Sequence, residues 1–79
     1  ESLSPSALAL ETLMLRLRTR DGLDMAAFGT RFGIDLSKRN TALLADLLAR
    51  KLVTIEGTWL RPTRAGLGVS DGIVAMFDL

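Results

Sequence analysis

The sequence predicts an α+β fold in which helices precede and follow a short β-hairpin. Residues 51–62 alternate β-branched or aromatic side chains with polar ones around a turn at residues 56–58, as two short strands do. The segments before and after this stretch carry apolar residues at helical spacing. Because a lone two-stranded hairpin is marginal in water, the helices must cover one of its faces. Three helices, a hairpin wing and a C-terminal helix outline a small winged-helix-like domain.

Size and charge narrow the possible functions. The chain has 79 residues, enough for one modest core, so we expect residues 1–79 to form a single domain. Ten basic and nine acidic residues give a net charge of +1, which creates no strong field for nucleic acid or an anionic membrane. Nucleic-acid binding is therefore not expected.

The chain has no cysteine and no histidine. Disulfides and the usual ligands of zinc, heme and iron–sulfur clusters are thus missing, and we expect no metal-binding or cofactor-binding residue. The longest apolar stretch, residues 8–17, is interrupted by polar side chains and is too short to span a membrane. The expected location is the cytoplasm. A start at Glu1 rather than Met agrees with a fragment of a larger protein.

The first helix is predicted to start with Ser4 as N-cap and Pro5 in the first turn, and to end near Arg18. Its core stripe is predicted to consist of Leu10, Leu13, Met14 and Leu17. Leu8 and Leu15 fall on nearly the opposite side. We expect them to contact a missing domain or a second subunit; the alternative is that they are ordinary exposed leucines.

The second helix is predicted to begin after Asp24 as N-cap and to end at Gly33. Leu23 and Phe28 have the spacing of a hydrophobic staple, which fixes the angle at which the chain enters the helix. Phe28 and Phe32 lie four residues apart, so both are expected to point into the core.

The third helix is predicted to run to about Lys51, with either Asp35 or Ser37 as N-cap. Its apolar face is predicted to consist of Leu36, Leu43, Leu44, Leu47 and Leu48. Its outward face is predicted to consist of Lys38, Arg39, Ala42, Asp46, Ala49 and Arg50. In a winged helix this helix would read the DNA major groove. Two alanines and an aspartate between basic ends are poor readers of base edges.

The last helix is predicted to follow Pro62, with Thr63 as N-cap, and to reach about Phe77. Its three glycines weaken it, so packing must compensate. Gly68 and Gly72 share a face, which permits close approach by another backbone. The predicted core stripe is Leu67, Val74 and Phe77. A second apolar stripe, expected to face another body, is Val69, Ile73 and Met76.

Several motifs together resemble a known family. They are ETLMLRLR at 11–18, Gly22, FGTRFGIDL at 28–36, the leucine-rich segment 47–52 and TRAG at 63–66 after the hairpin. From about Ser6 onward the chain resembles the C-terminal domain of the oxygen-independent coproporphyrinogen III oxidase family. That family includes radical S-adenosylmethionine enzymes of heme synthesis and related heme chaperones. Relatives commonly carry glycine at the position of Arg16 and a longer side chain at that of Gly68. These differences leave open the branch of the family to which the chain belongs.

The resemblance implies an accessory domain that packs on an N-terminal radical S-adenosylmethionine barrel and helps to enclose or position a tetrapyrrole. It implies a four-iron four-sulfur cluster, S-adenosylmethionine and, in a chaperone, heme in the parent protein. The CxxxCxxC motif that holds the cluster belongs to the barrel, so no catalytic residue carries over to this chain. An oxidase parent would decarboxylate two propionates to vinyl groups, whereas a chaperone would bind heme and pass it on.

Interdomain contacts are expected from six residues, namely Leu8, Glu11, Leu15, Arg18, Val69 and Ile73. Glu11 and Arg18 match motif positions, and they form either a local polar pair or a contact to the barrel. Met14, Met25 and Met76 are interpreted as packing residues rather than heme ligands. Two rival functions are a free-standing winged-helix DNA-binding regulator, with Thr58 at the wing tip, and a homodimerisation module that uses the first and last helices.

Overall fold

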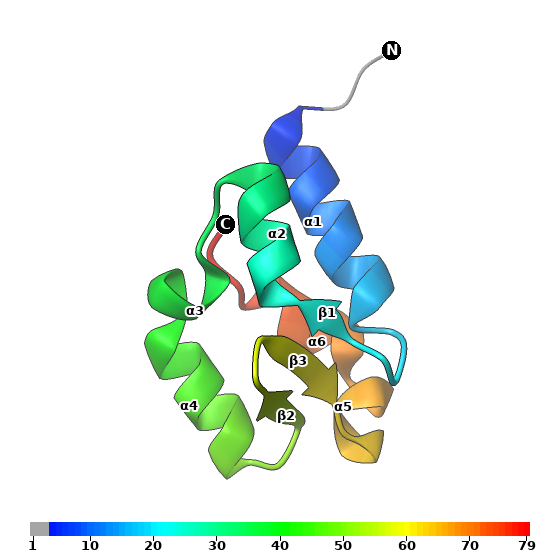
Figure 1. Ribbon diagram of the computed structural model, residues 1–79. Coiled ribbons are helices and arrows are strands. Elements are labelled where there is room, and N and C mark those ends of the chain that lie inside the picture. Colours follow the sequence, from blue (N-terminus) through cyan, green and yellow to red (C-terminus); the bar gives the residue numbers. More distant parts are fainter. Residues whose placement is uncertain (1–3) are drawn as a thin grey trace.

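The computed structural model describes residues 4–79, and these form six helices and three strands. The helices are α1 (Pro5–Arg16), α2 (Met25–Phe32), α3 (Leu36–Arg39), α4 (Thr41–Ala49), α5 (Arg64–Gly68) and α6 (Ser70–Ala75). The strands are β1 (Leu23–Asp24), β2 (Val53–Glu56) and β3 (Trp59–Pro62). Helices lie on both sides of the hairpin (Figure 1), so the α+β, helix-plus-hairpin prediction is confirmed.

The hairpin belongs to a three-stranded antiparallel sheet with the order β1-β3-β2. The sequence did not indicate β1, because two residues are too few to show alternation. Leu23 of β1 pairs with Leu60 of β3. Gly22, just before β1, has a φ of +74°, and a Cβ there would lie 2.1 Å from the carbonyl oxygen of Leu60. Only glycine lets the two backbones approach this closely.

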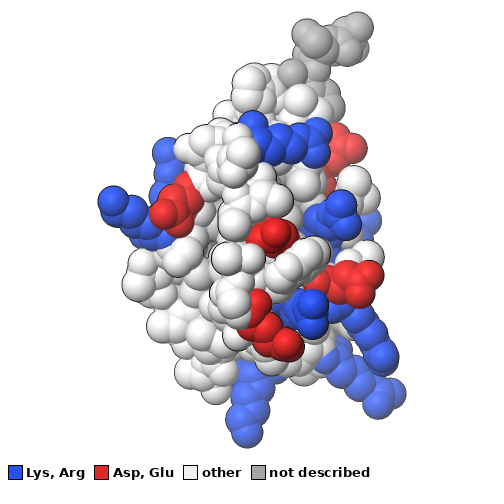
Figure 2. All heavy atoms as spheres, in the orientation of Figure 1, with Lys and Arg blue, Asp and Glu red and all other residues white. Residues whose placement is uncertain are grey.

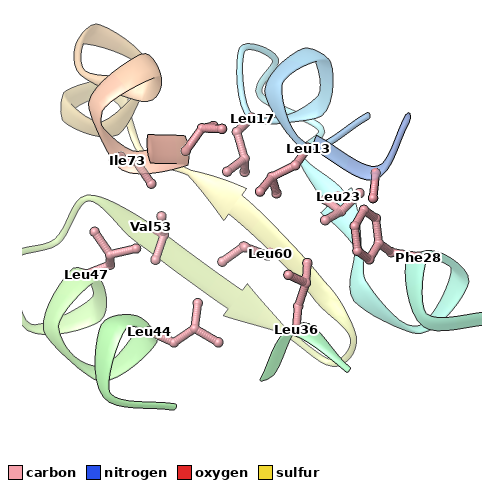
Figure 3. Close-up of a cluster of buried hydrophobic side chains, with 12 residues drawn as sticks. Leu13, Leu17, Leu23, Phe28, Leu36, Leu44, Leu47, Val53, Leu60 and Ile73 are labelled. Carbon is pink, nitrogen blue, oxygen red and sulfur yellow. The ribbon is translucent and has the colours of Figure 1, made fainter. Parts of the chain in front are cut away.

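One cluster of buried apolar side chains joins the helices to the sheet. Figure 3 shows Leu60 of β3 in its middle, with leucines of α1 on one side and leucines of α4 on the other. Leu13, Leu36, Leu47 and Leu60 are each fully buried. Burial of one such leucine stabilises the fold by about 1.5–3 kcal/mol, so this cluster is the main source of stability.

Four predicted helix caps are confirmed. The side chains of Ser4, Asp24 and Thr63 each accept a hydrogen bond from a backbone N–H in the first turn of the following helix. Gly33 ends α2 in the left-handed conformation, with φ of 69°. Of the two N-cap candidates for the third helix, Asp35 is the cap: its Oδ1 accepts a hydrogen bond from the Lys38 N–H at 3.0 Å.

Two predicted helices are each broken in the structure. The third helix divides at Asn40, which has φ of −124°, and the last helix divides at Val69, with φ of −127°. Asn40 is buried because its side chain bonds to the backbone of Asp78, a contact between distant segments. At Gly66, a Cβ would lie 1.9 Å from the Leu52 carbonyl oxygen. The backbone of α5 therefore packs closely against the residue that precedes β2.

Two leucines predicted to be in the core are exposed, Leu10 at 41% and Leu48 at 41%. On α1 the fully buried Ala9 lies in the core instead, in line with Leu13 and Leu17. Alanine at this position lets neighbouring elements approach α1 closely, whereas the sequence prediction gave weight only to bulky side chains. The staple residues Leu23 and Phe28 are both buried, as predicted, and Phe32 is half-buried with its ring 4.9 Å from that of Phe28.

Candidate functional site

The outer side of α1 carries two exposed leucines. Leu8 is 37% exposed and Leu15 is 56% exposed. They lie seven residues apart, so they share one face of the helix, nearly opposite the buried Leu13. Glu11 lies between them and is also exposed. The placement of these side chains agrees with the sequence analysis, and their contact with another body stays a prediction.

Arg18 has a different partner from the one considered in the sequence analysis. Its Nη2 lies 3.0 Å from Oδ1 of Asp71, so the ion pair joins the end of α1 to α6 rather than to Glu11. The two side chains are 51% and 77% exposed. An exposed pair of this kind contributes about 0–1 kcal/mol, because water screens the charges. Arg18 therefore helps to align two helices but adds little to stability.

The predicted outer stripe of the last helix requires a correction at Ile73. Ile73 is 2% exposed and belongs to the core of this domain, beside Val74. The prediction assumed one continuous helix from residue 64. The break at Val69 interrupts the helical periodicity, so residues of α6 face other directions than predicted. Val69 and Met76, at 49% and 54%, remain exposed. Ile73 is consequently not available to a partner.

Gly68 and Gly72 face open space. A Cβ added at either position would meet no atom within 4 Å, so no residue of the described chain approaches them closely. The close approach predicted for these glycines is therefore not made within residues 4–79. Near these glycines, the exposed side chains of Val69 and Met76 make the surface around α6 partly apolar.

A cleft of about 230 Å³ lies between α1, α2 and the paired strands β1 and β3. Both helices and both strands contribute side chains to it. Its lining consists of Thr12, Arg16, Gly22, Leu23, Asp24, Ala27, Phe28, Arg31, Phe32 and Trp59. The sequence analysis did not find this cleft, because it depends on how α1 approaches α2 and on strand β1. The only signal in the sequence was the single basic residue in each of the two helices, Arg16 and Arg31.

The charged groups of this cleft are unevenly distributed. Arg16 on α1 and Arg31 on α2 are both exposed, and neither makes an ion pair with another residue between 4 and 79. The Arg31 guanidinium lies over the Phe32 ring, 4.8 Å from its centroid. Asp24 is the one acidic residue of the lining, and its Oδ1 already accepts from the Ala26 N–H at 3.1 Å. The cleft thus has a formal charge of +1.

A second hollow of about 600 Å³ lies between α2, α3 and the hairpin turn. Small or uncharged residues make up nearly all of its lining. They are Met25, Ala26, Gly29, Thr30, Gly33, Ile34, Asp35, Ser37, Gly57 and Thr58. Asp35 is engaged as the cap of α3. This hollow therefore offers no distinct chemistry for a ligand.

The outward face of α3 and α4 carries the exposed basic side chains of Lys38, Arg39 and Arg50. The Arg50 Nε lies 3.0 Å from Oδ2 of Asp46, and Arg39 donates a hydrogen bond to the Leu79 carbonyl oxygen. Two of its basic side chains are thus engaged within the domain. Figure 2 shows basic and acidic groups interspersed over one face of the molecule rather than gathered in one basic area. The expectation that this face does not bind DNA stays a prediction.

The described residues contain no group of three or more potential metal-binding side chains. Met14 and Met25 are partly buried against the core, whereas Met76 is exposed on α6. Among residues 4–79, no helix has the length and apolar character needed to cross a lipid bilayer.

The fold and its surface define a small helix-plus-hairpin domain with mixed charge and with exposed apolar side chains on α1 and at the two ends of α6. A family model described as the HemN C-terminal domain matches residues 3–69. The chain therefore belongs to the HemN C-terminal domain family, and the resemblance in the sequence is confirmed. Membership implies an N-terminal partner domain in the parent protein. Searches of curated proteins and of solved structures gave no significant match.

Proposed function

We propose that this chain is the accessory C-terminal domain of an oxygen-independent coproporphyrinogen III oxidase-like protein. In this role it packs on the radical S-adenosylmethionine barrel of the parent and helps to enclose or position a tetrapyrrole. The family match over residues 3–69 carries the proposal. The iron–sulfur cluster, S-adenosylmethionine and the chemical steps belong to the barrel, whether the parent is an oxidase or a heme chaperone.

The exposed leucines of α1 support the packing. Full burial of one leucine side chain stabilises an interface by about 1.5–3 kcal/mol, and Leu15 alone is 56% exposed in this domain. Glu11 lies beside the leucines as a polar group, and a polar rim around an apolar centre is the usual composition of an interface. We therefore assign the barrel contact to the side of α1 that carries Leu8, Glu11 and Leu15.

Hydrogen exchange in the parent protein, expressed from its native coding frame, tests this contact. We expect the α1 amides to exchange more slowly in the parent than in the 79-residue chain. Leu15→Asp should remove the difference, because a carboxylate cannot be buried at an apolar contact without a partner. Leu48→Asp on α4 is the matched control, since Leu48 is also an exposed leucine. Equal exchange of α1 in parent and isolated chain would refute the contact.

Homodimerisation is the competing use of the same leucines. Sedimentation of the 79-residue chain at high concentration distinguishes homodimerisation from the barrel contact. If the chain forms a dimer and Leu15→Asp dissociates it, this face binds a second copy. The tetrapyrrole role is tested by titrating the parent with coproporphyrin and following the Soret band. Parent protein lacking residues 4–79 should bind more weakly, and unchanged binding would contradict a role in enclosure.

A further inference from the structure

We infer that the cleft between α1 and α2 holds one aromatic ring of a ligand together with the carboxylate groups that this ring carries. The identification of that ligand as a tetrapyrrole carrying carboxylate groups rests on the proposed function. The assignment to this cleft rests on its own side chains, which combine two arginines with aromatic rings. Carboxylates and rings are the two ligand features that such a lining recognises.

The two arginines supply the recognition of the carboxylates. Arg16 and Arg31 come from different helices that border the same cleft, and both are exposed and free of ion pairs within residues 4–79. A guanidinium group presents two parallel N–H donors that match the two oxygens of a carboxylate. Arg18, Arg50 and Arg61, by contrast, each form an ion pair with an acidic residue of this domain. The cleft therefore keeps two guanidinium groups available to an external anion.

The aromatic side chains supply a surface for a ring. Phe32 and Trp59 are both partly exposed and both line the cleft. An offset or edge-to-face contact between two aromatic rings adds about 0.5–1.5 kcal/mol beyond the burial of area. The Arg31 guanidinium already lies over the Phe32 ring at 4.8 Å, so one contact orients the cation beside the aromatic surface.

Asp24 gives the cleft a direction. Its carboxylate would repel a ligand carboxylate, and in the sheet register it lies opposite Trp59. The acidic groups of the ligand are consequently expected beside Arg16 and Arg31, away from Asp24. The remaining lone pairs of Asp24 can accept a hydrogen bond from an N–H donor of the ligand.

The volume of the cleft limits how much of the ligand it can hold. Sites for drug-sized molecules typically measure about 300–1,000 Å³, and this cleft measures about 230 Å³. It can take one ring with its acidic substituents but not a whole macrocycle. Leu8 lies one helical turn from Thr12 of the cleft lining, so the exposed apolar side of α1 adjoins the cleft. A body that covers these leucines would also cover the rest of the ligand.

The test uses the parent protein and coproporphyrin, with binding followed by the Soret band. We expect the Arg16→Gln and Arg31→Gln variants each to raise the Kd by about 10- to 100-fold, the usual loss for a charge-assisted hydrogen bond. The tetramethyl ester of coproporphyrin should bind weakly to wild type and be insensitive to both substitutions. Arg50→Gln together with Arg64→Gln is the control for net charge, because both residues are exposed and lie outside the cleft lining.

The outcomes separate the two proposals. Undiminished binding of coproporphyrin by the Arg16→Gln and Arg31→Gln double variant would overturn the assignment of the cleft and leave the proposed function standing. An equal loss in the Arg50→Gln and Arg64→Gln control would also overturn it, because net charge would then be the cause. Absence of any coproporphyrin binding by the wild-type parent would refute the assignment of the cleft and the tetrapyrrole role in the proposed function, whereas the packing on the barrel is tested separately by hydrogen exchange.

Discussion

Asn40 binds the backbone of Asp78 through both ends of its side-chain amide. The Nδ2 donates to the Asp78 carbonyl oxygen at 3.0 Å, and the Oδ1 accepts from the Asp78 N–H at 2.8 Å. The Nδ2 also donates to the Leu36 carbonyl oxygen at 3.1 Å. These bonds explain why a polar residue that is 5% exposed lies at the break between α3 and α4. They fix the C-terminal segment beside the core.

Substitution of Asn40 by alanine should lower the free energy of unfolding by about 1–3 kcal/mol, because two part-buried hydrogen bonds to the backbone of Asp78 are lost. Urea denaturation of the 79-residue chain measures the change. Thr41→Ala is the control, since the Thr41 hydroxyl is exposed and bonds only within the helices. Equal stability of Asn40→Ala and wild type would mean that the bonds to Asp78 contribute nothing.

The glycines of the last two helices should respond in opposite directions to alanine. Gly66→Ala places a Cβ 1.9 Å from the Leu52 carbonyl oxygen and should destabilise the domain by more than about 2 kcal/mol. Gly72→Ala meets open space within α6 and should stabilise it by up to about 1 kcal/mol. Thermal unfolding of the two variants gives the comparison. A stable Gly66→Ala variant would contradict the close approach of α5 to the hairpin.

Lys51 is the one residue other than glycine with a positive φ, 59°, in the described part of the chain. The Lys51 N–H bonds to the Leu48 carbonyl and the Leu52 N–H to the Leu47 carbonyl, the hydrogen-bond pattern of a Schellman motif, in which glycine is preferred at this position. Lys51→Gly should therefore raise the free energy of unfolding by about 0.5–1 kcal/mol. Arg50→Gly, at a right-handed position, should lower it, and guanidinium titrations of both variants check the signs.

Arg18→Gln removes the ion pair with Asp71 and should change the stability of the isolated chain by no more than about 1 kcal/mol, since both groups are exposed. The free energy of unfolding of wild type and variant should be measured at low and at high salt. The difference between them should shrink as the salt concentration rises. A loss well above this, or one that does not respond to salt, would show that Arg18 has a larger structural role than one surface ion pair.

Local chemistry made much of this fold predictable from the sequence. Ser4, Asp24 and Thr63 were recognised as caps because each acts on backbone groups two or three residues away. The hairpin was recognised because strand alternation and its turn are also local. These signals need no knowledge of the rest of the domain.

Contacts between distant segments could not be predicted in the same way. Asn40 looks like an ordinary residue within a helix until Asp78 is placed beside it, and the burial of Ile73 follows from the break at Val69. The cleft required the pairing of β1 with β3 and the approach of α1 to α2, neither of which is a local property. The exposed leucines were predictable because helical periodicity alone places Leu8 and Leu15 opposite Leu13.

The bonds between Asn40 and Asp78 span 38 residues, and this has a consequence for synthesis of the protein. A ribosome exposes α3 and α4 well before it exposes Asp78, so during that interval the Asn40 amide has only its local partner. The hairpin, whose strands are adjacent in sequence, can form within the same interval. The strands of the hairpin can thus pair before α3 and α4 gain their final arrangement, which requires the C-terminal segment.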